Sequence, residues 1–190
     1  MPEGAKKPAT YDDLFSLPEN MTGQIIDGEL IATPRPSRRH ARATSALNSE
    51  LGPPYDFGRG GPGGWILLVE PEVALGTNLV VPDLAGWRKE RLAEPEEHNW
   101  ISVAPDWVCE VLSPGTVRLD RIRKMALYAE HGVPHLWLVD PIETTLEVFR
   151  LEGGAWVLRG AYGGEERVRA EPFPEAEIEL THLWWESRET

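Results

Sequence analysis

Cysteine is almost absent from this chain of 190 residues, in which Cys109 is the only one. A framework of intrachain disulfides is therefore excluded. No apolar run approaches the roughly 20 residues that a membrane-spanning helix needs. The N-terminal stretch MPEGAKKPAT also lacks the apolar segment of a secretory signal. These absences favour a cytoplasmic protein that does not contact a membrane.

Positive charge is scarce as well, because 19 Lys and Arg face 31 Asp and Glu and leave a net charge of −12. Nucleic-acid binding requires basic groups against phosphates, so this total argues against it. The distribution argues the other way, since residues 30–49 hold four arginines and no acid. Residues 111–129 hold four bases and one acid. This asymmetry is typical of a nucleic-acid-binding face on an acidic body, although two solvated helix surfaces would give the same pattern.

Proline and glycine are scattered along the chain and form no linker, which favours a single domain over residues 1–190. We expect a loose tail over residues 1–10 and a core over about 37–140. The Asp27-Gly28 pair predicts an N-terminal β-hairpin over 24–31, and Ser37 is suited to cap a helix that ends near Leu51. Further elements are expected as strands over 65–75, 79–87, 106–112 and 135–140, a helix over 117–131, and a C-terminal hairpin over 145–159.

The order of these elements predicts how the strands pair. A helix between two apolar strands favours a parallel pair, whereas short turns between strands favour antiparallel pairing. The expected fold class is therefore α/β (α+β), with one mixed β-sheet flanked by helices and a β-hairpin near each end of the chain.

Two carboxylates fall within strands that are otherwise apolar: Asp83 in LVVPDLAG and Glu110 in WVCEVL. Such groups are rarely buried without partners. On neighbouring strands they would repel each other, unless one is protonated or a cation lies between them. Oxygen ligands on a rigid sheet suit Mg²⁺, which takes one or two carboxylates and keeps several waters. The pattern predicts that Asp83 and Glu110 bind Mg²⁺, with Mn²⁺ as a possible substitute.

A lysine follows on the helix that leaves the Glu110 strand. Asp120, Lys124 and Tyr128 are spaced four residues apart, so they form one polar stripe along that helix. A lysine near the strand end can orient an attacking water or stabilise charge that develops on a phosphate. We therefore predict Asp83, Glu110 and Lys124 as the catalytic residues.

Each of these three residues also has a structural interpretation. Asp83 follows a proline and would suit a turn. Glu110 could pair with an arginine such as Arg123, and Lys124 could simply pair with Asp120, a weak interaction on a surface.

At these residues the chain resembles the PD-(D/E)XK, or restriction-endonuclease-like, superfamily, and more narrowly the Uma-two family of endonucleases. The matching stretches are IIDGELI, PRPSRRH, VPDLAGW, DWVCEVLSPGT, DRIRKMALY and HGVPHLWLVDP, which together span roughly residues 11–150. The resemblance implies a restriction-endonuclease-like core and a Mg²⁺-dependent nuclease site. The superfamily places its lysine two residues after the glutamate, where this chain has Leu112, so Lys124 would take that part. Family members often carry Glu where this chain has Gln24.

Further residues are candidates for contact with substrate. His40 and Arg38 lie in the basic segment, and Asp120 and Tyr128 share the stripe of Lys124. His40 would equally suit a helix surface. Glu70 is a further candidate for the same cleft, because strand alternation alone does not fix which side of the sheet it faces. Cys109 should point away from Glu110 and into the core.

The function predicted from these observations is a Mg²⁺-dependent endonuclease that hydrolyses phosphodiester bonds in nucleic acid, DNA above all. Two alternatives remain open. One is an inactive binding or assembly module with the same fold, and the other is a hydrolase of a smaller phosphate ester. Cutting two strands usually takes two sites, and the apolar LTHLWW segment offers an interface, so we expect a homo-oligomer.

Overall fold

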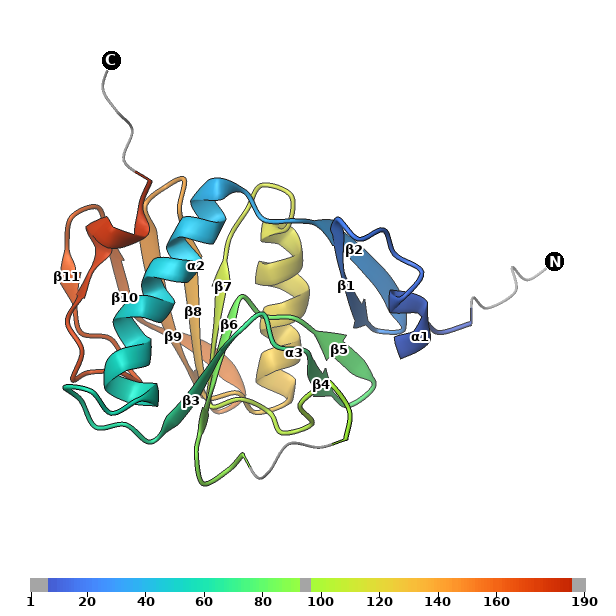
Figure 1. The fold of residues 1–190 in the computed structure, drawn as a ribbon, viewed down its shortest axis with the longest axis horizontal. Coiled ribbons are helices and arrows are strands. Elements are labelled where there is room, and N and C mark those ends of the chain that lie inside the picture. Colours follow the sequence, from blue (N-terminus) through green and yellow to red (C-terminus); the bar gives the residue numbers. More distant parts are fainter. Residues whose placement is uncertain (1–6, 93–96, 186–190) are drawn as a thin grey trace, which may run out of the picture.

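A computed structural model describes residues 7–92 and 97–185. In these residues the main sheet has six strands in the order β10-β9-β8-β7-β6-β3 (Figure 1). The expected parallel pair is present, because β7 and β8 run parallel while every other neighbouring pair in this sheet is antiparallel. The strands are β3 (Trp65–Val69), β6 (Leu84–Arg88), β7 (Trp107–Val111), β8 (His135–Asp140), β9 (Thr145–Glu152) and β10 (Ala155–Gly163).

The sequence predicts a single mixed sheet, but the structure also contains a second sheet. It has the order β2-β1-β5-β4 within the described part of the chain. The N-terminal hairpin β1–β2 turns at Asp27-Gly28, where both residues have the positive φ that this turn requires. The strands are β1 (Met21–Ile26), β2 (Glu29–Pro34), β4 (Val73–Leu75) and β5 (Asn78–Val80), and a small separate pair joins β11 (Arg167–Val168) to β12 (Ile178–Glu179).

The predicted strands over 65–75 and 79–87 are wrong as continuous elements. The first breaks after Val69, where Glu70 adopts a φ of 48° and Pro71 follows. The second breaks at Pro82, which has no N–H to donate to a ladder. Each broken strand therefore contributes one piece to the main sheet and one piece to the second sheet.

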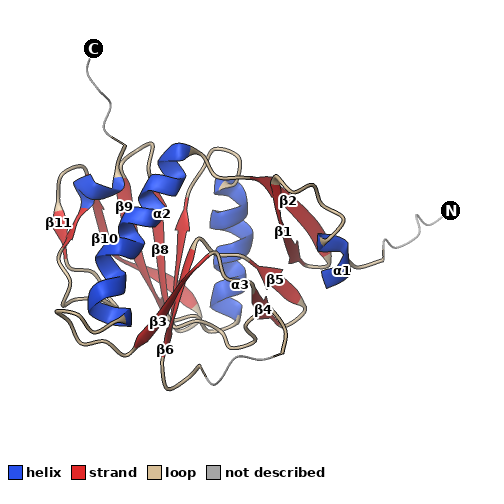
Figure 2. Ribbon diagram, in the orientation of Figure 1, coloured by secondary structure: helices blue, strands red, loops and turns tan. Residues whose placement is uncertain are grey.

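Helices cover both faces of the main sheet (Figures 1 and 2). Helix α2 (Arg38–Leu51) begins at Ser37, whose hydroxyl accepts a hydrogen bond from the His40 N–H, as expected for a helix cap. The chain is helical over most of the predicted range 117–131, but part of this helix is π-helical. The other helical segments are α1 (Tyr11–Leu14), η1 (Gly52–Asp56), η2 (Leu119–Lys124), α3 (Met125–Glu130) and the 3₁₀ helix η3 (Leu180–Leu183).

Strand alternation in β7 divides the core between these faces. Trp107, Cys109 and Val111 join the cluster packed against α2, whereas Val108 joins the cluster packed against α3. Cys109 is fully buried and free, as the sequence predicted. Glu110 consequently points toward the α3 side of the sheet. In the described residues no helix is both long enough and apolar enough to cross a bilayer.

His135, at the start of β8, makes stability depend on pH. Burial lowers the pKa of this imidazole, and the nearby charges of Arg150 and Arg88 lower it further. The unfolded chain then binds more protons than the folded chain just below the ordinary histidine pKa of about 6.5, so stability falls as pH drops through that window. His135→Gln should lose less stability than wild type between about pH 7 and 5. Urea unfolding at both pH values measures this, and equal losses in the two proteins would refute it.

Candidate active site

Asp83 lies in the break between β5 and β6, not inside a strand as the sequence indicated. Its carboxylate is held from two sides. Oδ2 accepts a hydrogen bond of 2.6 Å from the Val111 N–H of β7, and Oδ1 lies 3.0 Å from His40 Nε2 on α2. Pro82, which has no N–H to donate to a ladder, separates β5 from β6 just before Asp83, and the Asp83 side chain extends to the neighbouring strand β7.

Glu110 occupies the centre of the main sheet on β7 and is 2% exposed. Its Oε1 accepts a hydrogen bond from the Tyr128 hydroxyl of α3 and lies 2.7 Å from Lys124 Nζ. No hydrogen bond to Oε2 is found among the described residues. One oxygen of Glu110 is therefore held by the α3 side, and the other remains for a ligand.

Lys124 reaches Glu110 from the end of η2, although it lies 14 positions further along the chain. Its ammonium is also 3.6 Å from Asp120 Oδ1 and 3.3 Å from the carbonyl of Val81, and the side chain is 2% exposed. A buried cation with three oxygen partners is compensated rather than isolated. Arg123, the alternative partner of Glu110, instead binds the N-terminal hairpin at Glu29.

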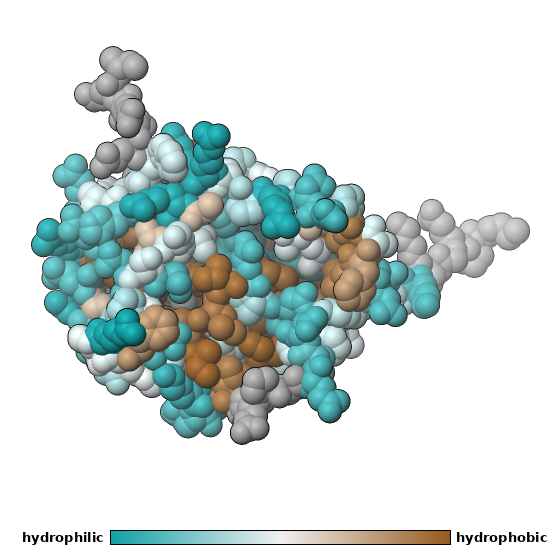
Figure 3. Space-filling view, viewed as in Figure 1, coloured by the Kyte–Doolittle hydropathy of each residue, from teal (hydrophilic) through white to brown (hydrophobic). Residues whose placement is uncertain are grey.

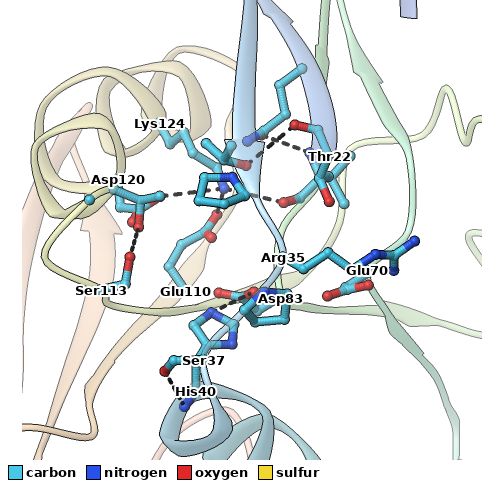
Figure 4. Close-up of a pocket in the computed structure, with 17 residues that line it drawn as sticks. Thr22, Arg35, Ser37, His40, Glu70, Asp83, Glu110, Ser113, Asp120 and Lys124 are labelled. Carbon is cyan, nitrogen blue, oxygen red and sulfur yellow. Dashed lines mark hydrogen bonds and ion pairs between the residues drawn. The ribbon is translucent and has the colours of Figure 1, made fainter. Parts of the chain in front are cut away.

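These side chains line one cavity of about 240 Å³ (Figure 4). Asp83, Glu110, Lys124, Asp120 and His40 all contribute to its wall, and so does Glu70. The polar lining residues that sequence reasoning missed include Arg35, Ser113 and Thr116. The signal for the last two was the SPGT turn directly after the Glu110 strand. Gln24 also lines the cavity, and its Oε1 accepts a hydrogen bond from the Val81 N–H.

Burial shifts the pKa values of the charged side chains on the inner wall of the cavity. It raises the pKa of Glu110 to about 8, against the opposing charge of Lys124. Burial likewise raises the pKa of Asp120. For Lys124, burial alone would lower the pKa, but the charges of Glu110 and Asp120 outweigh it and raise the pKa instead. Lys124 thus stays charged, yet it does not offset the burial of both carboxyls, and a further cation would lower their pKa values.

His40 is nine-tenths buried and serves as a partner of Asp83. Burial lowers the pKa of the imidazole, but the hydrogen bond and charge of Asp83 reverse the effect and raise it. The other ring nitrogen, Nδ1, is buried with no hydrogen-bond partner in the described part of the chain. His40 is therefore placed to orient the Asp83 carboxylate.

Other candidates lie outside the cavity. Arg38 is exposed at the start of α2 and does not line it. Tyr128 is fully buried behind Glu110, a position suited to holding that carboxylate and not to touching substrate.

The donor set fits one hard divalent cation. In the described residues, no group of three or more His, Cys, Asp or Glu is arranged to hold a metal. Mg²⁺ does not need such a group, because it commonly binds one or two carboxylates, several waters and substrate phosphate. Asp83 and Glu110 supply two carboxylates at the cavity wall, and no residue in the described part of the chain donates a hydrogen bond to Glu110 Oε2.

Comparisons with known proteins agree with the fold. Residues 9–182 match the model of the Uma2 family, described as "Putative restriction endonuclease". The structure resembles a crystal structure from Anabaena variabilis, titled a putative nuclease belonging to DUF820, with a TM-score of 0.69 and 26% identity. That similarity covers 93% of this chain and 97% of the other. No curated protein matches the sequence.

Proposed function

We propose that this chain, which belongs to the Uma2 family of restriction-endonuclease-like proteins, hydrolyses phosphodiester bonds in DNA with the help of Mg²⁺. One observation carries the proposal: Asp83, Glu110 and Lys124, distant in sequence, line a single cavity. The lysine reaches the glutamate even though its place in the chain differs from the superfamily pattern.

The position of each residue in the cavity determines its proposed role. Asp83 and Glu110 would hold the cation, which supplies polarisation of a phosphoryl oxygen and a lower pKa for bound water. His40 and the Val111 N–H keep the Asp83 carboxylate in place. Tyr128 and Lys124 hold Glu110. From this position the Lys124 ammonium would stabilise negative charge as it develops on the phosphate oxygens.

A polyanionic substrate is supported by the charges around the cavity. Arg35 lines its wall, and Arg38, Arg39 and Arg42 are exposed on the adjoining helix α2. Phosphates approached from this side would meet the basic segment of an otherwise acidic protein. This placement explains how a chain with a net charge of −12 would still engage a polynucleotide.

Incubation with supercoiled plasmid, single-stranded DNA and nucleotide esters tests the proposal. We expect cleavage of DNA with Mg²⁺ or Mn²⁺ and none with EDTA. Cleavage of nucleotide esters alone would replace the nuclease with a hydrolase of smaller phosphate esters. Absence of any metal-dependent hydrolysis, together with absence of metal binding, would favour an inactive module of the same fold.

A further inference from the structure

A second cavity continues from the candidate active site along helix α2. It has a volume of about 280 Å³ and lies between α2 and the end of β3. His40 and Glu70 line both this space and the first cavity. We call it the α2 groove, formed on one side by Thr44, Ser45 and Asn48 and on the other by Val69. A ligand held at Asp83 and Glu110 would therefore extend into the groove without leaving the surface.

The part of the groove beyond the shared residues carries no charged side chain. Val69 is 49% exposed there, and Figure 3 shows hydrophobic residues on this face beside α2. Two polar side chains line the same space. The half-buried amide of Asn48 is one of them, and the other is His40, whose Nδ1 is buried without a hydrogen-bond partner among the described residues. The groove thus combines an apolar surface with hydrogen-bonding groups.

We propose that the α2 groove binds the nucleobase and sugar of the nucleotide next to the scissile phosphate, a proposal that rests on the proposed nuclease function. A base has apolar faces and a polar edge, and this combination matches Val69 and Asn48. Asparagine amides pair with base edges through a donor and an acceptor. Phosphates would lie outside the groove, where α2 exposes its arginines.

The groove also restricts the substrate class. It adjoins the catalytic cavity directly and offers space for one nucleoside. A base that enters it must leave its partner and its stack, which costs least when the nucleotide is already unpaired. Proteins that bind single strands hold unpaired bases through contact with the base faces, most often by aromatic stacking, and through hydrogen bonds at the base edges. In the α2 groove the contact would come from Val69 and the His40 ring, and the edge hydrogen bonds from Asn48. The substrate is accordingly single-stranded DNA, or a duplex with an unpaired nucleotide at the cleavage point.

A pair of identical substitutions one helical turn apart tests the groove. Ser45→Leu places a larger side chain in it, whereas Ser49→Leu makes the same change at an exposed position of α2 outside the lining. The readout is kcat/KM for a single-stranded oligonucleotide divided by kcat/KM for methyl p-nitrophenyl phosphate, which has no base. Ser45→Leu should lower this ratio about tenfold, the size expected for the loss of one good base contact, and Ser49→Leu should leave it unchanged. Equal ratios in both variants would overturn the proposal.

Oligonucleotide binding measured without metal tests the groove proposal separately from the proposed nuclease activity. A single-stranded tetranucleotide is titrated in EDTA while the side-chain amide of Asn48 is followed by ¹⁵N NMR. A shift of this signal in wild type that is lost in Ser45→Leu supports the groove, even if the protein cleaves nothing. Metal-dependent cleavage without a shift of the Asn48 signal would refute base binding in the groove but would still support the nuclease function. Neither cleavage nor a shift would reject both.

Discussion

Asp83→Asn is expected to reduce metal-dependent DNA cleavage about 10³-fold. The substitution removes the charge of a proposed cation ligand but keeps the shape of the side chain. A bound metal contributes several kcal/mol to a phosphoryl-transfer transition state, and about 4 kcal/mol corresponds to a thousandfold in rate. Glu110→Gln should have an effect of similar size.

Asp56→Asn provides a matched control for Asp83→Asn. Asp56 is also partly buried, with 22% of its side chain exposed against 17% for Asp83. It likewise accepts a hydrogen bond from a strand N–H, that of Leu67, but it does not line the cavity. We expect full cleavage in this variant. Both variants should unfold cooperatively, with some loss of melting temperature in Asp83→Asn because its amide nitrogen would face Val111 N–H or His40. Cleavage by Asp83→Asn at the rate of the control would eliminate Asp83 as a ligand.

At a pH above about 8, where Glu110 and Lys124 are both charged, Lys124→Met should reduce the free energy of unfolding by about 3–5 kcal/mol, the cost of breaking a buried ion pair from one side. The ammonium is 2.7 Å from Glu110 and both side chains are 2% exposed. Without it, burial would raise the pKa of Glu110 further, because the opposing charge is gone. Cleavage should be lost as well.

A double-mutant cycle distinguishes the interaction between Lys124 and Glu110 from a simple loss of packing. Lys124→Met with Glu110→Gln leaves neither partner charged, so the double variant should be more stable than the sum of the single losses predicts. The expected coupling is about 1–3 kcal/mol, as found for residues within one polar network. Additive losses in urea unfolding of the four proteins would show that the pair is not coupled.

The main elements were predictable because their signals are local. Asp27-Gly28 between apolar runs gave the hairpin, and Ser37 gave the start of α2. Strand β8 coincides with the apolar segment His135–Asp140. Membership of the family and the restriction-endonuclease-like fold are likewise confirmed. The cytoplasmic location and the homo-oligomer stay predictions.

The strand breaks and the second sheet were not predictable from periodicity alone. Residues 65–75 and 79–87 are mostly apolar, and a sequence of that kind predicts two long strands. Pro71 and Pro82 were the available signals, but only the tertiary structure shows that the chain changes sheets there. For the same reason Asp83 was predicted inside a strand, although the break is what turns its carboxylate toward Val111 and His40.

The candidate site was predictable in its residue types and less so in its geometry. Carboxylates within apolar segments pointed to Asp83 and Glu110, since burial without partners is costly. The spacing of Asp120 and Lys124 gave their shared stripe. Whether Lys124 reaches Glu110 depends on how η2 packs against β7, a long-range contact with no local signature. Arg35 and Glu70 reach the cavity through loops, for the same reason.

Calorimetric titration of Mn²⁺ or Mg²⁺ into wild type and Asp83→Asn tests most directly whether Asp83 and Glu110 form a cation site. We expect one bound cation per chain in wild type and at least about a tenfold loss of metal affinity in Asp83→Asn, whereas the metal affinity of Asp56→Asn should be unchanged. Equal affinity in all three proteins, or no binding by wild type, would contradict it.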